Sequence, residues 1–206
     1  MEVVKAVDPT ESGNCSKRLC CGNAFFLYEV IMKKQKFHLY HIDMKYIRDM
    51  AKADDNVMSI SPQTGKSSRP FVGIIVMCSG IWYCIPFSSP KEKHKTMKND
   101  KDFSRMFDKR GKLIGVLNFN NMIPVYSDVI SEIDIRLQQT DDSKTKAYKG
   151  LLNDQLDWCN ANMEAIGRKA NKLYQLILNG EGNHLLKKRC CDFVRLEKVM
   201  QKWLSK

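Results

Sequence analysis

The sequence predicts an α+β domain in which a compact, strongly curved antiparallel sheet comes first and helices follow. Short apolar runs of strand-like composition are confined to residues 37–126. From residue 148 onwards the apolar residues recur at helical spacing instead. At 206 residues the chain is long enough for one domain with a sizeable core.

Residues 1–31 differ from this pattern, and we interpret them as an N-terminal extension that is either non-native or disordered. They include three cysteines and have no lasting periodicity. The stretch 28–32 also back-translates to a purine-rich sequence just ahead of an ATG, which makes Met32 a candidate native start. The alternative is a short ordered appendage anchored by Phe25, Phe26 and Leu27. We therefore place a single domain over residues 32–206.

The first elements of this domain are predicted from local signals. A β-rich run over 37–42 leads to Asp43, a good N-cap for a short helix. The apolar residues of that helix are Met44, Tyr46, Ile47 and Met50. Residues 54–69 form a polar loop that is rich in Ser, Asp and Lys.

Two nearly continuous apolar runs, 71–78 and 81–87, flank Ser79-Gly80, and this arrangement favours a tight hairpin. Pro86 predicts an edge or a bulge in the second strand, because proline cannot donate to a ladder. A basic loop over 91–112 leads to a third strand over 112–119.

The remaining chain predicts helices. Asn120-Asn121 makes a turn into the apolar run 122–126, and the period of the pattern then changes. One helical face contains Tyr148, Leu152, Gln155, Cys159 and Met163. The next helix stops at Asn179-Gly180 and contains Ile166, Ala170, Leu173, Tyr174, Ile177 and Leu178. The last helix follows Asp192 and contains Phe193, Leu196, Met200, Trp203 and Leu204.

The charge of the chain favours a polyanionic partner. Lys and Arg number 34 against 23 Asp and Glu, which gives a net charge of +11. Neutralising phosphates with such a surface releases condensed counterions. The alternative is a generally basic soluble protein. No run reaches the ~18 apolar residues of a membrane span, and no signal peptide is evident, so we expect a cytoplasmic protein without a membrane partner.

The eight cysteines predict neither a disulfide framework nor a metal site. Two pairs are vicinal, Cys20-Cys21 and Cys190-Cys191, and the others are scattered. No C-x-x-C occurs, and the four histidines show no ligand spacing with the cysteines. We expect reduced thiols, most of them in the core, with no metal and no small-molecule cofactor.

The segment Ser88-Ser89-Pro90-Lys91 is the candidate active site. It follows a strand directly, so two hydroxyls and an ammonium group project from a strand end into a basic loop. One alternative is a Ser-Pro turn with solvated lysines. Another is a Ser-Lys acyl hydrolase, which needs a desolvated lysine. Lys91 stands instead among Lys93, Lys95, Lys98 and Lys101, in a polar loop.

RNA cleavage fits these residue types better. RNA carries its own nucleophile, the 2′-hydroxyl, so the protein need only align the attack, move protons and stabilise the charge on the phosphorane. Hydroxyls and cations are sufficient for these tasks. DNA lacks that hydroxyl, and its cleavage usually requires a metal. The charge of the chain and the Ser/Ser/Lys segment therefore point to the same substrate.

Residues 37–206 resemble the ToxN/AbiQ toxins of type III toxin–antitoxin systems along almost their whole length. The matching motifs, in chain order, are FHLYHIDMKYI, RPFVGIIV, WYCIPFSSPK, GVLNFNNMIPV, YKGLLNDQLDW and CDFVRLEK. The resemblance implies a Kid/MazF-like curved β-core with surrounding helices. It implies a metal-independent endoribonuclease that cuts mRNA and the precursor of its own antitoxin. It also implies that a repeat-encoded, pseudoknotted RNA antitoxin inhibits the toxin in a closed protein–RNA assembly.

The resemblance also implies site residues. The Thr/Ser-Ser-x-Lys site of the family falls on Ser88, Ser89 and Lys91, as the catalytic residues. The RNA-binding positions fall on Tyr46, Arg69 and Trp158. This chain departs from the family at Gly65, where members often have an aromatic residue, and Arg69 replaces a lysine. Lys66 is the residue that could compensate.

Other cations are expected to contact phosphates, and several residues have a second interpretation. The expected contacts are Lys93, His94, Lys95, Lys98, Lys144, Lys146 and Lys149. Tyr46 has the spacing of a core residue, and Trp158 could pack against the sheet rather than stack on a base. His94 suits a general base by its chemistry, but phosphate contact fits a basic loop equally well. The alternative to an enzyme is a basic RNA-binding protein that does not cut.

Overall fold

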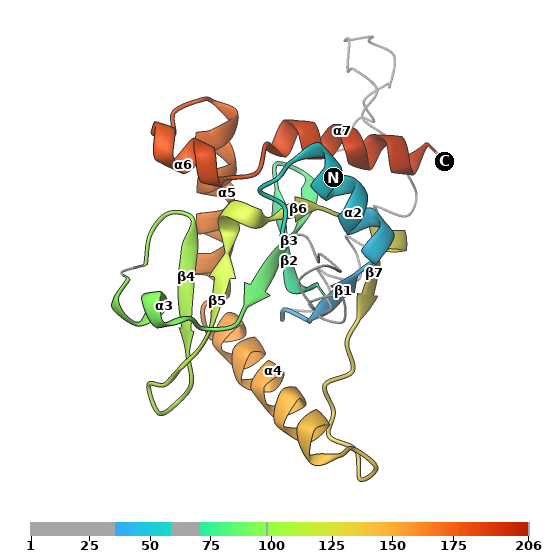
Figure 1. The fold of residues 1–206 in the computed structure, drawn as a ribbon, viewed down its shortest axis with the longest axis vertical. Helices are drawn as coiled ribbons and strands as arrows, with labels where there is room; N and C mark the ends of the chain where they lie inside the picture. The colour runs from blue at the N-terminus through green and yellow to red at the C-terminus, as the bar shows by residue number, and fades with distance from the viewer. Residues whose placement is uncertain (1–35, 59–70, 98, 206) are drawn as a thin grey trace, which may run out of the picture.

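The structure is a computed structural model that describes residues 36–58, 71–97 and 99–205. The N-terminal extension, Lys66, Arg69 and Lys98 lie outside the described residues. The described chain is an α+β domain whose strands pair in antiparallel fashion, with a helical C-terminal part (Figure 1). The predicted fold class is confirmed.

The chain enters the sheet through the short strand β1, Tyr40–Ile42, and continues into helix α2, Met44–Ala53. Asp43 caps this helix, because its carboxylate accepts the backbone N–H of Tyr46 at 2.8 Å. The helix buries Tyr46, Ile47 and Met50 against the rest of the molecule. Both the cap and the apolar face are those predicted.

The predicted hairpin is confirmed in β2, Val72–Cys78, and β3, Ile81–Ser88. Ser79 and Gly80 both have a positive φ, 48° and 83°. Positive φ at both central residues matches the twist of a two-residue hairpin, and only the glycine adopts it without strain. The strands are buried along almost their whole length, as their continuous apolar runs predicted.

The prediction that Pro86 marks an edge or a bulge was wrong. Strand β3 lies inside the sheet, whose order is β4-β5-β3-β2-β1-β7, and Pro86 pairs in unbroken register with Gly73 of β2. On the side away from β2, Tyr83 and Cys84 pair with the short strand β6, Ile123–Pro124. Phe87 and Ser88 pair instead with β5, Leu113–Asn118. Pro86 therefore lies where β3 exchanges one neighbour for another, and its missing N–H interrupts no ladder there.

The expectation of a loop over 91–112 was wrong. This segment contains the short helix α3, Glu92–Thr96, and the strand β4, Phe103–Phe107, which pairs with β5. The turn between β4 and β5 is closed by Asp108, whose carboxylate accepts the N–H groups of Arg110 and Lys112. The sequence did not predict these two elements, because each contains only a few buried residues and the lysines around them obscure the apolar pattern.

After β5 the chain forms two 3-10 turns, Phe119–Asn121 and Ser127–Val129, on either side of β6. It then forms the last strand, β7, Ile130–Glu132, which pairs with β1 at the edge of the sheet.

Helices α4, Ser143–Ala161, α5, Met163–Leu178, and α7, Phe193–Leu204, confirm the three predicted helices. The short helix α6, His184–Arg189, was not predicted. Helix α4 packs against β4 and β5, α5 against β2, and α7 against β6 and α2. Gln155 of α4 donates its buried amide to the carbonyl of Ile114 in β5 at 2.8 Å. In the described part of the chain no helix is long and apolar enough to cross a bilayer.

The described cysteines are buried free thiols, namely Cys78, Cys84, Cys159, Cys190 and Cys191. Burial raises the pKa of the Cys78 and Cys190 thiols to about 12, so both remain protonated at neutral pH. These residues act as small apolar side chains of the core.

Candidate active site

The predicted catalytic residues lie where β3 ends. Ser88 is the last residue of the strand and is half-buried, whereas Ser89 and Lys91 are exposed on the connection to α3. Ser88 is held in the ladder, opposite Val116 of β5. The two hydroxyls and the ammonium group therefore leave one well-anchored strand end, next to α3 (Figure 1).

Asn118, at the end of β5, contacts Ser88 and was not among the predicted residues. Its amide nitrogen donates to Ser88 Oγ at 3.0 Å and lies 3.4 Å from the carbonyl oxygen of Pro86. A carbonyl only accepts, so this second contact keeps the nitrogen side of the amide toward Ser88. Ser88 Oγ is thus the acceptor, and its own hydrogen can be donated to a phosphate oxygen. The sequence gives no signal for this contact, which depends on the pairing of β3 with β5.

Lys91 is the N-cap residue of α3, and two hydrogen bonds with His94 fix its backbone. The N–H of Lys91 donates to Nδ1 of His94 at 3.1 Å, and the N–H of His94 donates to the carbonyl of Lys91 at 2.8 Å. The side chain of Lys91 is exposed while its backbone is held at both polar groups.

His94 is only 8% exposed, although it stands among lysines in the sequence. Burial lowers its pKa, and the positive charges of Lys93 and Lys91 lower it further. The ring is therefore neutral at pH 7, with Nδ1 as an acceptor. This position does not fit the predicted phosphate contact, because the ring is buried and Nδ1 already has a donor.

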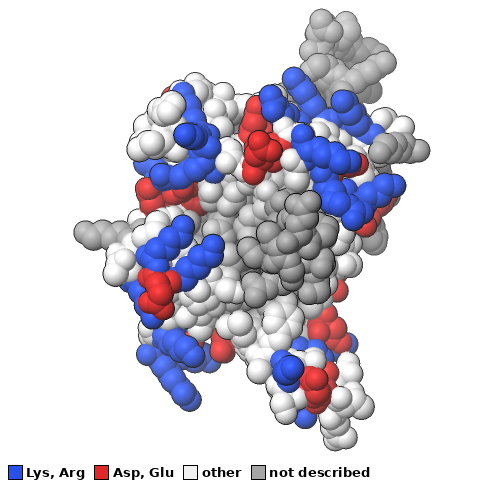
Figure 2. Space-filling model, in the orientation of Figure 1, with Lys and Arg blue, Asp and Glu red and all other residues white. Residues whose placement is uncertain are grey.

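The lysines beside the site, Lys93 and Lys95, are exposed to solvent. Lys95 pairs with Glu92 at 2.9 Å, but both side chains are open to solvent and the pair contributes little to stability. Arg105 of β4 donates to the carbonyl of Lys95 at 3.1 Å and ties α3 to the sheet. Figure 2 shows Lys and Arg side chains over α3, over α6, and in a third group over α2 and α7.

Tyr46 does not fit the predicted RNA contact. Its side chain is fully buried, and its hydroxyl donates to the carbonyl of Pro124 at 2.8 Å. The ring meets Tyr126 and Trp203 edge-on, with centroids 6.0 and 5.3 Å away. The second interpretation of the sequence, in which Tyr46 is a core residue, therefore describes this position. Trp158 is half-buried and also packs against the core.

The structure does not bring the lysines of α4 to the site. Lys144 and Lys146 are exposed near the start of α4, at the end that projects from the body of the molecule (Figure 1). Lys149 is only 15% exposed and pairs with Asp141 at 2.8 Å, while also donating to the carbonyl of Arg136 at 3.0 Å. Lys149 therefore does not offer a free charge to a phosphate, contrary to the prediction.

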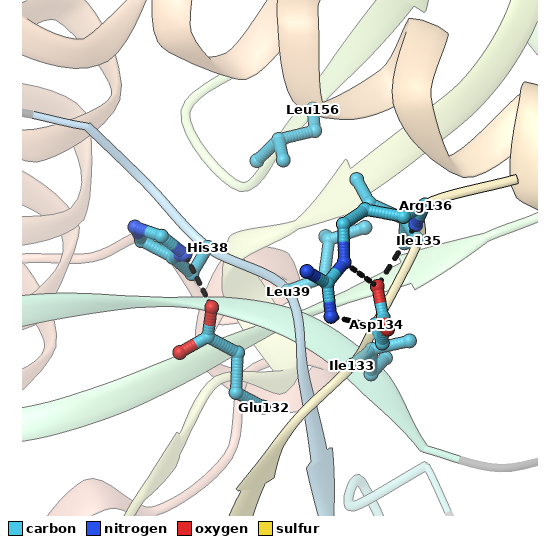
Figure 3. Close-up of a pocket in the computed structure, with 8 residues that line it drawn as sticks. All are labelled: His38, Leu39, Glu132, Ile133, Asp134, Ile135, Arg136 and Leu156. Carbon is cyan, nitrogen blue, oxygen red and sulfur yellow. Dashed lines mark hydrogen bonds and ion pairs between the residues drawn. The ribbon is translucent and has the colours of Figure 1, made fainter.

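A pocket of about 480 Å³ lies elsewhere, between α4 and the chain around β1 and β7, and no predicted site residue lines it (Figure 3). Its polar side chains already have partners, since His38 bonds to Glu132 at 2.6 Å and Arg136 pairs with Asp134 at 2.8 Å. Within the described residues, no three His, Cys, Asp or Glu side chains gather in a way that could hold a metal ion.

The chain and its fold match a known class of toxins. The family model for the toxin ToxN of type III toxin–antitoxin systems matches residues 38–201. Because this match covers most of the chain, the protein belongs to the ToxN family, and the resemblance inferred from the motifs is confirmed.

Individual relatives agree with this assignment. The endoribonuclease ToxN of Bacillus thuringiensis subsp. kurstaki is 33% identical over 177 residues, which are 82% of this chain and 84% of that protein. The endoribonuclease ToxN of Pectobacterium atrosepticum is 28% identical over 161 residues, which are 77% of this chain and 88% of that protein.

Two solved structures also resemble the chain. A type III toxin studied for its selective inhibition by a non-coding RNA pseudoknot superposes with a TM-score of 0.66 at 31% identity, over 83% of this chain and 99% of its own. AbiQ, a lactococcal anti-phage endoribonuclease, superposes with a TM-score of 0.67 at 22% identity, over 83% of this chain and 99% of its own, and at that identity it supports the fold alone.

Proposed function

We propose that this toxin is a metal-independent endoribonuclease that cuts RNA by attack of the 2′-hydroxyl on the adjacent phosphate. The observation that carries the proposal is the set Ser88, Ser89 and Lys91 at one strand end, in a chain whose relatives are endoribonucleases. The Ser/Ser/Lys set needs only to position the phosphate and stabilise charge, because the nucleophile belongs to the RNA.

Each residue has a distinct part in this mechanism. The ammonium of Lys91 stabilises the phosphorane and can protonate the leaving 5′-oxygen, for which it must be cationic. Ser89, which is exposed, donates a hydrogen bond to a phosphate oxygen. Ser88 does the same from a fixed position, since Asn118 occupies the acceptor side of its hydroxyl. The products are a 2′,3′-cyclic phosphate and a 5′-hydroxyl.

The proposed partners are RNAs. The substrates are mRNA in the cytoplasm and the precursor of the antitoxin. The antitoxin itself is a repeat-encoded, pseudoknotted RNA that holds the toxin inactive in a closed protein–RNA complex. The solved type III toxin at 31% identity supports this, because it was described as selectively inhibited by a non-coding RNA pseudoknot.

The chemistry is tested on the products of purified protein. We expect cleavage of a mixed-sequence transcript to persist in excess EDTA and to leave 2′,3′-cyclic phosphate ends. An oligonucleotide with a 2′-deoxy sugar on the 5′ side of the mapped cut should be inert, because it lacks the nucleophile. Cleavage of that oligonucleotide would contradict the mechanism. So would a transcript that stays uncut in EDTA.

The site is tested by substitution. We expect Lys91→Ala to abolish growth arrest, and Ser89→Ala to lower cleavage at least ten-fold, since a lost donor at a developing oxyanion costs about 10²–10³ in rate. Both side chains are exposed, so the free energy of unfolding should change by less than ~0.5 kcal/mol. If wild type and Lys91→Ala arrest growth equally, the site is elsewhere. If neither arrests growth but both bind RNA, the protein is an RNA-binding module that does not cut.

A further inference from the structure

His94 is the one histidine of the sequence that the structure places against a proposed catalytic residue. It sits three residues after Lys91, in the short helix α3, with its ring turned back onto the backbone of Lys91. A histidine in a lysine-rich segment would be expected in solvent, yet this ring is buried. Burying an imidazole ring costs solvation free energy unless its nitrogen atoms are hydrogen-bonded, so the bond between the ring and Lys91 is important for this segment.

The ring makes the half of a capping box that Glu or Gln usually makes. In that motif the side chain of the third helical residue accepts the N–H of the N-cap residue. Here Nδ1 of His94 is the acceptor and Lys91 is the N-cap residue, and the reciprocal backbone bond runs from His94 N–H to Lys91 C=O. Lys91 is therefore fixed at its N–H and its C=O, just where its side chain leaves the backbone.

We propose that His94 is a positioning residue that aims Lys91 at the scissile phosphate, and that it acts as an acceptor in its neutral form without touching the RNA. The inference rests on the proposed function, because it concerns the same Lys91. On this proposal His94 neither transfers a proton in the reaction nor contacts a phosphate.

The same contact makes the site sensitive to acid. A protonated ring carries hydrogens on both nitrogens, so Nδ1–H would face the N–H of Lys91, and two donors cannot bond. The charged groups acting on the ring are Lys91 and Lys93 of its own segment, while Arg105 reaches α3 from β4 through the carbonyl of Lys95. All of these are cationic, and burial together with the charges of Lys93 and Lys91 lowers the pKa of His94 below its ordinary value of 6.5.

The sign of the effect follows directly. The lowered pKa means that the neutral ring is the form present above pH 6.5. The capping contact is complete there and is lost as the pH falls through the lowered pKa. The activity that depends on it should decline in the same window.

The test compares His94→Ala with His94→Gln in the full chain, with kcat and KM measured on an RNA oligonucleotide that spans a mapped cut site. We expect His94→Ala to lower kcat about 10- to 100-fold, the range for a displaced catalytic group. KM should change little, because phosphate contacts remain. His94→Gln should restore kcat to within about three-fold, since glutamine is a usual capping-box acceptor.

The pH profile separates positioning from proton transfer. Glutamine does not titrate, so His94→Gln should lose the part of the acid decline that wild type shows below pH 6.5. His184→Gln is the matched histidine control, because His184 is exposed on α6, and it should keep the wild-type profile. Thr96→Ala is the control for α3, since Thr96 bonds only within that helix, to the carbonyl of Lys93, and it should cut normally.

The outcomes divide cleanly. A His94→Ala enzyme as active as wild type would overturn the inference while leaving the proposed function intact. A His94→Gln enzyme as inactive as His94→Ala would also overturn it, and would assign the ring to proton transfer. If Lys91→Ala itself cuts RNA normally, the proposed site fails first. Thermal unfolding is followed for each variant, and if His94→Ala does not fold, the profiles of His94→Gln and wild type decide alone.

Discussion

Single side chains at the end of β3 depend on neighbours that are far away in the sequence. Ser88 is oriented by Asn118, which lies 30 residues later on the adjacent strand. The Asn118 amide can orient this hydroxyl only if β3 and β5 keep their register. That register is fixed by the pairing of Phe87 with Leu117 and of Ser88 with Val116. The hydroxyl is thus set by a strand pairing rather than by its own loop.

This dependence predicts a coupling between Ser88 and Asn118. We expect Asn118→Ala to lower kcat several-fold, because the Ser88 hydroxyl then rotates freely. The double variant with Ser88→Ala should be no worse than Ser88→Ala alone, since Asn118 would act through Ser88. Steady-state cleavage by the four proteins of this cycle measures the coupling. Additive losses would show that Asn118 has a separate role, for instance in holding the strand pair together.

Sequence reasoning reached the residues of the site unevenly. The positions of Ser88, Ser89 and Lys91 followed from a motif that is contiguous in the chain. The burial of His94 did not follow, because a run of lysines hides a helix of only five residues. Tyr46 could be read as either a base-stacking or a core residue, and only the three-dimensional packing against Trp203 and Pro124 decided for the core.

Elements were predictable where their signals are local. The N-caps Asp43 and Asp192 and the Ser79-Gly80 hairpin have characteristic residue types at fixed spacing, and all were confirmed. The strand β4 and the helix α6 were not predicted, because each is short and is stabilised by contacts with residues far away in the sequence. Intrinsic preference is too weak to specify such elements on its own.

Helix α6 is one such element, and it anchors the connection between α3 and β4. Arg189, at its C-terminal end, bonds through Nε to the carboxylate of Asp102 and reaches Asp100 at 3.0 Å. Asp102 is only 4% exposed, so its charge needs this partner. The chain from Lys91 to β4 is therefore fixed at its far end by a charge pair.

We expect Arg189→Ala to lower the free energy of unfolding by about 1–3 kcal/mol, the cost of leaving a buried polar group without its partner. Adding Asp102→Asn should recover part of this loss, because the uncompensated charge is removed. Lys188→Ala, at an exposed neighbouring position, should change stability by less than ~0.5 kcal/mol. Urea unfolding of the variants measures these differences. An Arg189→Ala protein as stable as wild type would show that solvent already screens the pair.

At the scale of the whole molecule, the positive charge on the face drawn in Figure 2 falls into several separate groups rather than gathering at the site. Lysines and arginines lie over α3, over α6, and over α2 and α7, with acidic side chains between them (Figure 2). An RNA that touches more than one of these groups must extend beyond the strand end. This arrangement suits a folded RNA better than a single short strand.

We therefore expect the affinity for the antitoxin RNA to fall steeply with salt, with a slope of about −0.7 to −0.9 per neutralised phosphate. Lys93→Ala should reduce that slope by about one such step. Lys149→Met should not, because Lys149 is already paired with Asp141. Filter binding across a salt series gives the slopes, and light scattering should show one discrete complex, since repeated bridging contacts either close or polymerise. A salt-insensitive complex would rule out this mode of binding.

The change of neighbours at Pro86 has a consequence for how Ser88 is placed. Most of β3 is bound to β2 and β6, but its last two residues, Phe87 and Ser88, are bound to β5. The last two residues of the strand are therefore placed by β5, which pairs with β4 and packs against α4, and not by the hairpin. Met106, Ile114 and Leu117 of β4 and β5 belong to the same core as the hairpin. A substitution at one of these buried positions can accordingly shift Ser88 without touching any residue of the site.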